Sequence, residues 1–337
     1  SDDGQTLVIG APLDTWFTAG DGQNYATNDQ GDSDGSIEIY KKSGETWNFL
    51  ERIQNPVVDS SLGDGFHPGF GKSISVSSDG SIIAVGTGGG ESVFTYALDN
   101  NTDLYSQIGK LTDLASQDTQ GNSASINDYA TLNGSNNQTT KFGLQLDLSD
   151  DGTRLIVNRS NLMNLETGSH EGNADIYSYD SNLDTWSLDK HIEIIGNTDS
   201  VSIADSTNRD QVGVAISGDG QTVAIGNPKG GDVSTYQGQV LFYELDTSTN
   251  TWQFNDEIFG ETSQNLGYHN SIALSDTGST AVLGGYGGSS SGVHVYNDTG
   301  NTRTYTSPAA NAVFTPTVLA VSDSTPPTSS ITASVSE

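Results

Sequence analysis

Short apolar runs separated by polar turns recur along almost the whole chain. The clearest copy is FGKSISVSSDGSIIAVG, residues 70–86, in which two runs of β-favouring residues flank an Asp-Gly turn. Such a pair predicts a β-hairpin, because Gly takes positive φ without steric cost. Similar turns, with a broken sixth copy, begin at Ser1, Ser77, Ser149, Ser217, Ser275 and Ser322.

A second hairpin follows in each unit, marked by a Tyr and a large aromatic residue seven or nine positions later. These pairs are Tyr40 and Trp47, Tyr96 and Tyr105, Tyr177 and Trp186, Tyr243 and Trp252, and Tyr296 and Tyr305. Two hairpins give four strands per unit, and such a unit repeated along a chain is typical of a β-propeller blade. The pattern therefore predicts an all-β propeller of four-stranded blades, most simply five, with six or seven as alternatives.

The repeats define the expected domain organisation. A propeller over residues 1–324 would contain repeats near 1–60, 70–113, 142–196, 212–260 and 268–310. The first repeat starts at its second strand, and residues 314–324 have the pattern of the missing one. We expect this C-terminal strand to close blade 1, because closure removes exposed sheet edges. Residues 325–337 read as a Pro/Ser/Thr linker to a following domain.

Composition and charge narrow the function classes. Only 33% of the 337 residues are hydrophobic and 40 are Gly, as many short strands and turns require, and no helical periodicity is present. The net charge of −31 disfavours nucleic acid and anionic lipid as partners, and favours divalent cations and a salty medium. The chain has no Cys and no apolar run long enough to span a membrane.

Several short motifs resemble a known repeat family. Phe70-Gly71 and Phe142-Gly143 open two blades, Gly10-Ala11-Pro12 follows the second strand of the first, and third strands read GSIEIY, GQVLFY and SGVHVY. This arrangement resembles the FG-GAP repeats of integrin α-subunit propellers and their microbial relatives. The resemblance implies an extracellular surface protein and calcium in Asp-rich loops. The turns here carry only one or two Asp, which more simply cap the turns.

One long insertion gathers the candidate binding residues. Asp29, Asp32 and Asp34 lie within NDQGDSDG, and clustered carboxylates are hard oxygen donors that suit Ca²⁺. Trp16 and Tyr25 belong to the same insertion and could stack on sugar rings. Solvated loop acids and aromatic packing against the blade edge are the simpler alternatives.

No catalytic motif stands out. The five His residues are scattered, and no nucleophile elbow or phosphate loop is present. Asp147, in LQLDLS, is a candidate inward acid, but one acid makes no acid–base pair, and bonding to a neighbouring strand or exposure to solvent is the simpler expectation. We therefore expect a non-enzymatic extracellular propeller module of a larger surface, appendage or matrix protein, acting in adhesion or assembly through contacts with other surface or filament proteins. The alternatives are a calcium-assisted carbohydrate-binding module that binds glycans and, less favoured, a polysaccharide-cleaving enzyme.

Overall fold

The chain folds into antiparallel β-sheets. The computed structural model describes residues 1–12, 35–56, 69–88, 92–112, 142–163, 170–194, 212–227, 237–268, 271–285, 292–298 and 303–306. These residues form five sheets and contain no helix. Accordingly, the described part of the chain has no helix that could cross a membrane.

Each sheet is one blade, and its strands follow chain order. Blade 1 has three strands: β1 (Thr6–Ala11), β2 (Ser36–Ser43) and β3 (Thr46–Gln54). Blades 2 to 5 have four strands each. Blade 2 comprises β4 (Phe70–Val76), β5 (Ile82–Thr87), β6 (Ser92–Asp99) and β7 (Leu104–Thr112). Blade 3 comprises β8 (Leu146–Leu148), β9 (Arg154–Met163), β10 (His170–Asp180) and β11 (Thr185–Ile194). Blade 4 comprises β12 (Val214–Ile216), β13 (Thr222–Asn227), β14 (Gln239–Asp246) and β15 (Thr251–Phe259). Blade 5 comprises β16 (Ile272–Leu274), β17 (Thr280–Gly285), β18 (Gly292–Asp298) and β19 (Arg303–Thr306).

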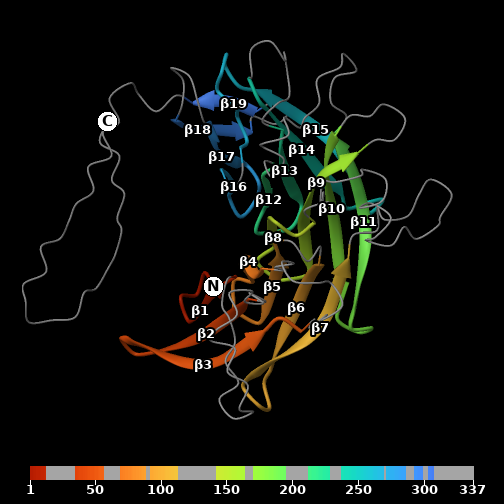
Figure 1. Cartoon of the computed structure of the whole chain (residues 1–337). Coiled ribbons are helices and arrows are strands. Elements are labelled where there is room, and N and C mark those ends of the chain that lie inside the picture. The colour runs from red at the N-terminus through yellow and green to blue at the C-terminus, as the bar shows by residue number, and fades with distance from the viewer. Residues whose placement is uncertain are drawn as a thin grey trace, which may run out of the picture.

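The blades stand side by side around a common centre. Figure 1 shows them as an open arc, with β1 of blade 1 and the innermost strands β4, β8, β12 and β16 of the other blades nearest the centre and the outer hairpins at the rim. This arrangement is that of a β-propeller, so the predicted fold class is confirmed. The count of five blades stays a prediction, because the closing strand 314–324 and the linker 325–337 lie outside the described residues.

The core lies between neighbouring blades, because each sheet is apolar on both faces. In blade 2, Phe94 and Tyr96 pack toward blade 1, while Ala84 and Val93 pack toward blade 3. Alternation along a strand sends successive side chains to opposite faces, and here both faces are buried. The blade faces therefore hold the arc together.

In blades 2 to 4 a Ser-x-Asp-Gly turn joins the innermost strand to the next strand, and these turns also link adjacent blades. In blade 2 the Ile82 N–H donates to Ser77 Oγ at 2.9 Å, and the Ser81 N–H donates to Asp79 Oδ1 at 2.8 Å. Gly80 takes φ +70°, as the hairpin prediction required. The Ser78 N–H reaches across to the carbonyl of Asp150 at 2.8 Å, so neighbouring turns form a chain of hydrogen bonds near the centre.

The FG and GAP glycines are explained by close approach of neighbouring blades. A Cβ on Gly10 would overlap the carbonyl oxygen of Gly71, and one on Gly86 would overlap that of Gly143. Blade 3 has Asn158 at the position that Gly10 and Gly86 occupy in blades 1 and 2. The Asn158 Nδ2 donates to the carbonyl of Val212 in blade 4 at 3.3 Å. At each of these close approaches between blades, the chain has either a glycine or a side chain that hydrogen-bonds to the next blade.

Candidate functional site

The residues predicted to bind calcium and glycan belong to the insertion between β1 and β2. Trp16, Tyr25, Asp29, Asp32 and Asp34 all lie outside the described residues. Within the described ranges, no group of three acidic or His side chains is arranged to hold a metal ion. The candidate site must therefore be sought among the innermost strands.

Asp147 lies on β8, the innermost strand of blade 3, and is held by both neighbouring blades. Its Oδ1 accepts a hydrogen bond from the Ser75 hydroxyl of β4 at 3.1 Å. Its Oδ2 accepts one from the Ile216 N–H of β12 at 3.0 Å. Asp147 thus bonds two neighbouring strands, the simpler of the expectations from the sequence. The side chain nevertheless remains partly exposed.

Burial sets the protonation of this carboxyl group. Desolvation by the surrounding blades raises the pKa of Asp147 to about 6, and the hydrogen bonds from Ile216 and Ser75 only partly oppose that rise. The charge of Asp150 raises it further. Asp147 can therefore exchange a proton at mildly acidic pH, which ordinary carboxylates do not.

A second carboxyl group, Asp150, stands at the turn three residues later. It lies against Gly218 of blade 4, where an added Cβ would overlap its carboxylate. Its pKa is raised by desolvation and then by the charges of Asp2 and Asp276, which come from the turns of blades 1 and 5. Asp147 and Asp150 thus both have a pKa above the ordinary value of an Asp side chain.

The other turn carboxylates have a different role. Asp151 Oδ1 accepts from the Ser149 hydroxyl at 2.7 Å and from the Thr153 N–H at 2.9 Å, as the turn-capping prediction required. Equivalent bonds hold Asp3, where the Ser1 hydroxyl and then the Gln5 N–H lower the pKa. For Asp150 the capping expectation is wrong. Asp151, the third residue of the turn, makes the capping bonds, whereas Asp150, the second, lies against Gly218 of the next blade.

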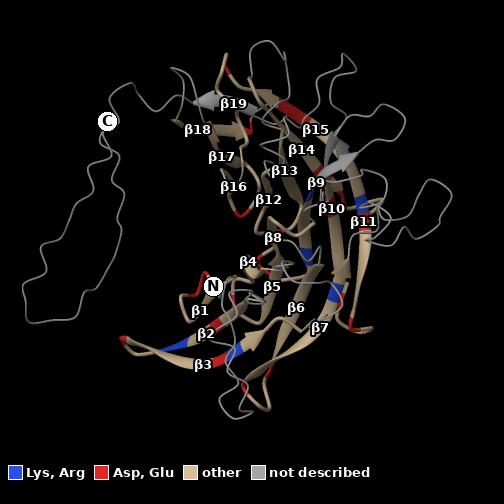
Figure 2. Ribbon diagram, in the orientation of Figure 1, with Lys and Arg blue, Asp and Glu red and all other residues tan. Residues whose placement is uncertain are grey.

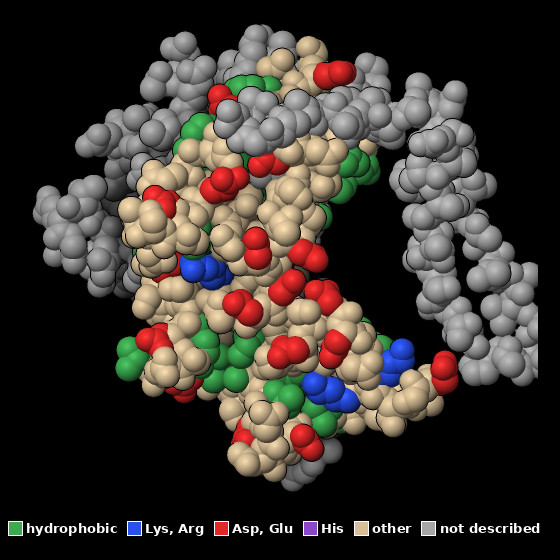
Figure 3. All heavy atoms as spheres, turned by 180° about the vertical axis from the view of Figure 1, so that it is seen from behind, with side chains coloured by type: hydrophobic (Ala, Val, Ile, Leu, Met, Phe, Trp, Pro, Cys, Tyr) green, Lys and Arg blue, Asp and Glu red, His purple; other side chains and the backbone are tan. Residues whose placement is uncertain are grey.

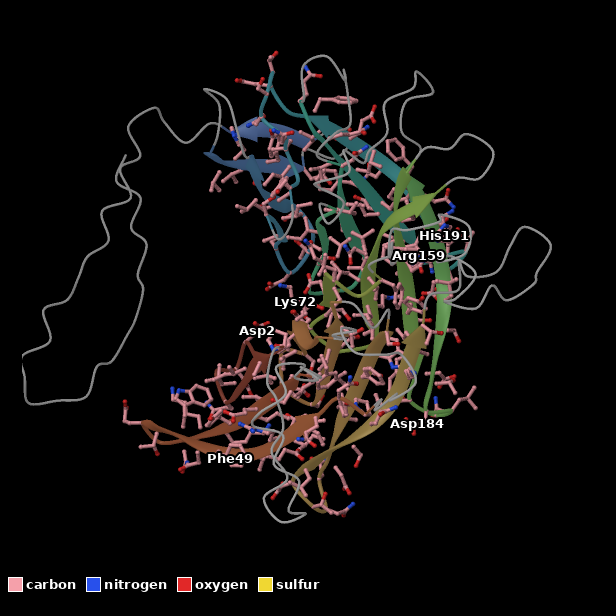
Figure 4. All side chains as sticks on the ribbon, in the orientation of Figure 1. Asp2, Phe49, Lys72, Arg159, Asp184 and His191 are labelled. Carbon is pink, nitrogen blue, oxygen red and sulfur yellow. The ribbon has the colours of Figure 1, made fainter. Side chains whose placement is uncertain are left out.

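Acidic side chains gather at this end of the innermost strands. Figure 3 shows them around the middle of one face, beside the hollow at the open side of the arc, and Figure 2 shows acidic turns near the N-terminus and at the end of β16. Asp2, labelled in Figure 4, lies at the inner end of blade 1. The potential at this end is therefore negative, which disfavours anionic ligands.

Blade 3 also holds a buried ionic network. Arg159 Nη2 lies 2.6 Å from Asp175 Oδ2, and His191 Nδ1 lies 2.5 Å from Asp175 Oδ1. Asp175 is fully buried, and the Tyr177 hydroxyl donates to it at 3.3 Å. Figure 4 shows Arg159 and His191 on the same part of this blade. Burial of the Asp175 carboxylate is tolerated here because Arg159, His191 and Tyr177 all lie within hydrogen-bond distance of it.

Sequence reasoning did not bring these groups together. Ser75 and Asp147 occupy the same repeat position, two residues before the turn serine, and an alignment of the repeats could have paired them. Arg159, Asp175 and His191 have no recognisable spacing, because three different strands supply them. Only the strand register places them on one face.

Comparison with solved structures relates the chain to other propellers. Two provisionally named 6-phosphogluconolactonases, from Bacteroides uniformis and Bacteroides fragilis, are similar at 9% sequence identity, with TM-scores of 0.49 and 0.48. Each alignment covers 81% of this chain and 64% of the other, so the chain spans less than two thirds of their length. TolB from Acinetobacter baumannii is 14% identical with a TM-score of 0.40, over 90% of this chain and 53% of TolB. No family model matches the chain, and no curated protein matches it in sequence.

These comparisons correct two sequence-based predictions. The sequence predicts a non-catalytic adhesion or assembly module and, with it, no enzymatic activity. Both predictions are wrong, because the propellers that the chain resembles include provisionally named 6-phosphogluconolactonases, which are enzymes. At this low identity the likeness concerns the fold alone, so the chemistry of this chain has to be argued from its own residues.

Proposed function

We propose that the chain is a propeller enzyme that acts by acid–base catalysis on a neutral, hydroxyl-rich substrate such as a glycan. The observation that carries this proposal is the position of Asp147, on an innermost strand and held by donors from the blades on either side. Fixed donors orient a carboxyl group, and orientation is what general acid–base catalysis requires.

Asp147 and Asp150, the two carboxyl groups near the propeller centre, have different catalytic roles in this proposal. Asp147, the more desolvated, donates a proton to the leaving oxygen at mildly acidic pH. Asp150, the less desolvated of the two, stays ionised and accepts a proton from the attacking water. Two carboxyl groups in different environments are the usual equipment for hydrolysis of a glycosidic bond.

Charge supports a neutral or cationic substrate. Asp2, Asp150 and Asp276 surround the same end of the innermost strands, and the whole chain carries −31. A phosphorylated substrate, of the kind in the names of the two Bacteroides structures, would be repelled there. Glycans without acidic groups would not.

A substrate screen with a matched pair of variants tests the proposal. Hydrolysis of neutral oligosaccharides is measured from pH 4 to 8 with the wild type, with Asp147→Asn and with Asp246→Asn, which alters an exposed turn of the outer hairpin of blade 4. We expect Asp147→Asn to lower kcat by about 10²-fold or more and Asp246→Asn to leave it unchanged. Full activity in Asp147→Asn would refute the assignment.

We also propose that Asp29, Asp32 and Asp34 bind Ca²⁺ and that Trp16 and Tyr25 stack on the glycan. Oxygen donors at close spacing and aromatic residues in the same insertion support this proposal. Calorimetric titration with Ca²⁺ checks it, comparing the wild type with the variant in which the three Asp residues are replaced by Asn. Equal heats would contradict it.

We further propose that the repeats are of the FG-GAP type and that the protein works outside the cell. The Gly10–Gly71 and Gly86–Gly143 approaches give the FG and GAP glycines a common physical purpose, which supports the first proposal. The acidic, cysteine-free composition supports the second. Fractionation of the native host, followed by immunodetection, checks the location, and recovery in the cytosol would contradict it.

A further inference from the structure

The side chains around Asp147 form one layer of the propeller centre. The residues two positions before the turn serines are Ser75 in blade 2, Asp147 in blade 3, Ala215 in blade 4 and Ala273 in blade 5. Two blades fold with Ala at this position, so the fold itself does not need a polar group there. The polar pair formed by Ser75 and Asp147 is therefore available for chemistry.

The hydroxyl of Ser75 has a fixed orientation. Its Oγ accepts a hydrogen bond from the Leu148 N–H at 3.0 Å. It also lies 3.1 Å from Asp147 Oδ1. Because the backbone N–H can only donate, the serine must use its own proton toward the carboxylate. The Leu148 N–H of blade 3 thus orients the Ser75 hydroxyl so that it donates to Asp147.

We propose that Ser75 is the positioning residue of Asp147, fixing the rotamer of the carboxyl group and favouring its ionised form. This inference rests on the proposed function for its catalytic meaning, but the hydrogen bond is independent of it. A donor to a carboxylate stabilises the charged state, and its removal from a desolvated site favours the protonated state.

Several other carboxyl groups belong to the turns at the same end of the propeller as Asp147. Asp150 is on its own blade, Asp79 and Asp219 are in the turns of blades 2 and 4, and Asp2 and Asp276 are in those of blades 1 and 5. Of these groups, Asp150 raises the pKa of Asp147 by its charge, and Asp2, Asp219 and Asp276 raise that of Asp150. The Ile216 N–H, the Ser75 hydroxyl and the Leu148 N–H lower the pKa of Asp147, and of these three only the Ser75 donor can be removed by substitution.

The chain supplies a matched control on the same strand. Ser73 Oγ donates to the carbonyl of Gly143 at 2.6 Å, so it makes a similar bond to blade 3 without touching Asp147. Ser73→Ala deletes one hydrogen bond between blades 2 and 3, and Ser75→Ala deletes the two that Ser75 makes with Asp147 and Leu148. Only Ser75→Ala should change the pKa of the Asp147 carboxyl group.

The primary measurement is the NMR titration of the Asp147 carboxyl carbon in the full chain, which does not depend on activity. We expect Ser75→Ala to move the midpoint upward by about one pH unit, since a hydrogen bond to a charged group is of that size. Ser73→Ala should leave it unchanged. An unaltered midpoint in Ser75→Ala would overturn the proposal.

Two further variants keep the test decisive. Ser75→Thr retains the hydroxyl and should restore the wild-type midpoint. Ser75→Cys, a weaker donor of similar size, should shift the midpoint in the same direction as Ser75→Ala but less, and it serves if Ser75→Ala does not fold. A Ser75→Cys midpoint equal to that of the wild type would count against the proposal.

Activity separates this inference from the proposed function. If Asp147 is the general acid, the pH profile of glycan hydrolysis in Ser75→Ala should shift by the same amount as the NMR midpoint. A shifted midpoint in a protein that hydrolyses no glycan supports the positioning role and rejects the proposed function. Hydrolysis with an unshifted profile and midpoint rejects the positioning role alone.

Discussion

Glycine occurs where the backbone of one blade touches the backbone of the next. The carbonyl oxygens of Gly71 and Gly143 stand where a Cβ on Gly10 or Gly86 would lie. At the same scale, Ser75 and the Ile216 N–H hold Asp147 between three blades. Single residues thus set both the spacing between blades and the orientation of the Asp147 carboxyl group.

Gly86→Ala should destabilise the protein strongly. The new methyl group would meet backbone of blade 3, which cannot move aside cheaply, and we expect a loss of roughly 1–3 kcal/mol in the free energy of unfolding. Urea unfolding measures it. Gly88→Ala is the control, because its Cβ meets only the flexible side chain of Lys72, and its effect should stay within about 0.5 kcal/mol. Equal losses would contradict the close-approach explanation.

The raised pKa of Asp147 predicts a pH dependence of stability. Its folded-state pKa of about 6 is above the ordinary value of 3.8, so its contribution is fully present below about pH 4 and is lost as the pH rises through 6. Asp147→Asn should remove this decline. The free energy of unfolding is compared at pH 4, 5, 6 and 7, and parallel curves for the two proteins would contradict the assignment.

Asp79 provides a control of opposite sign. Desolvation acts against it, but hydrogen bonds from Ser81 and Ser77 lower its pKa overall. Its contribution is therefore present at neutral pH and is lost on acidification below the ordinary value. Asp79→Asn should cost most at pH 7 and least at acid pH.

At the level of elements, the end blades differ from those inside the arc. Val93 of blade 2 and Val240 of blade 4 are fully buried, whereas the equivalent Val293 of blade 5 is 61% exposed among the described residues. On blade 1, Ile9 is 46% exposed, whereas the equivalent Val85 of blade 2 is fully buried. Both ends of the arc thus present apolar faces that the other blades bury against a neighbour.

The predicted closure by residues 314–324 can be tested on these ends. If that segment pairs with β1, deletion of 314–337 should lower Tm by about 5 °C or more, because an apolar strand would be lost. Deletion of 325–337 alone should leave Tm unchanged. Equal Tm values for the full chain and both truncations would reject closure.

For the whole molecule, charge is the dominant global property. The chain carries 43 acidic and 12 basic residues, and some of its few cations lie over aromatic rings of other blades. Lys41 of blade 1 lies 5.4 Å from the ring centre of Tyr105 in blade 2, and Arg154 of blade 3 lies 5.9 Å from that of Trp252 in blade 4. Repulsion among the remaining carboxylates opposes the compact state.

Salt should therefore stabilise this protein. Raising NaCl from about 0.05 M to 1 M shortens the Debye length from more than 10 Å to about 3 Å and weakens that repulsion. We expect Tm to rise, by similar amounts with and without chelator if screening rather than calcium is responsible. A fall in Tm would show that the ion pairs outweigh the repulsion.

The order of apolar and polar residues is sufficient to predict the repeat, the strands and the turns. Alternating apolar residues around Asp-Gly predict hairpins because these requirements are local, and Asp79 and Asp151 cap their turns as expected. The predicted Tyr–aromatic hairpins in blades 2 to 4 correspond to β6–β7, β10–β11 and β14–β15. Local chemistry repeated five times was sufficient for the fold class.

Contacts between residues of different blades depend instead on how the sheets pack. Ser75 and Asp147 are 72 positions apart and touch because adjacent blades stand at a fixed spacing around the centre. Asp175 joins Arg159 and His191 through the register of three strands. Those distances depend on how whole sheets pack, and alternation along one strand carries no information about its neighbour across the blade interface.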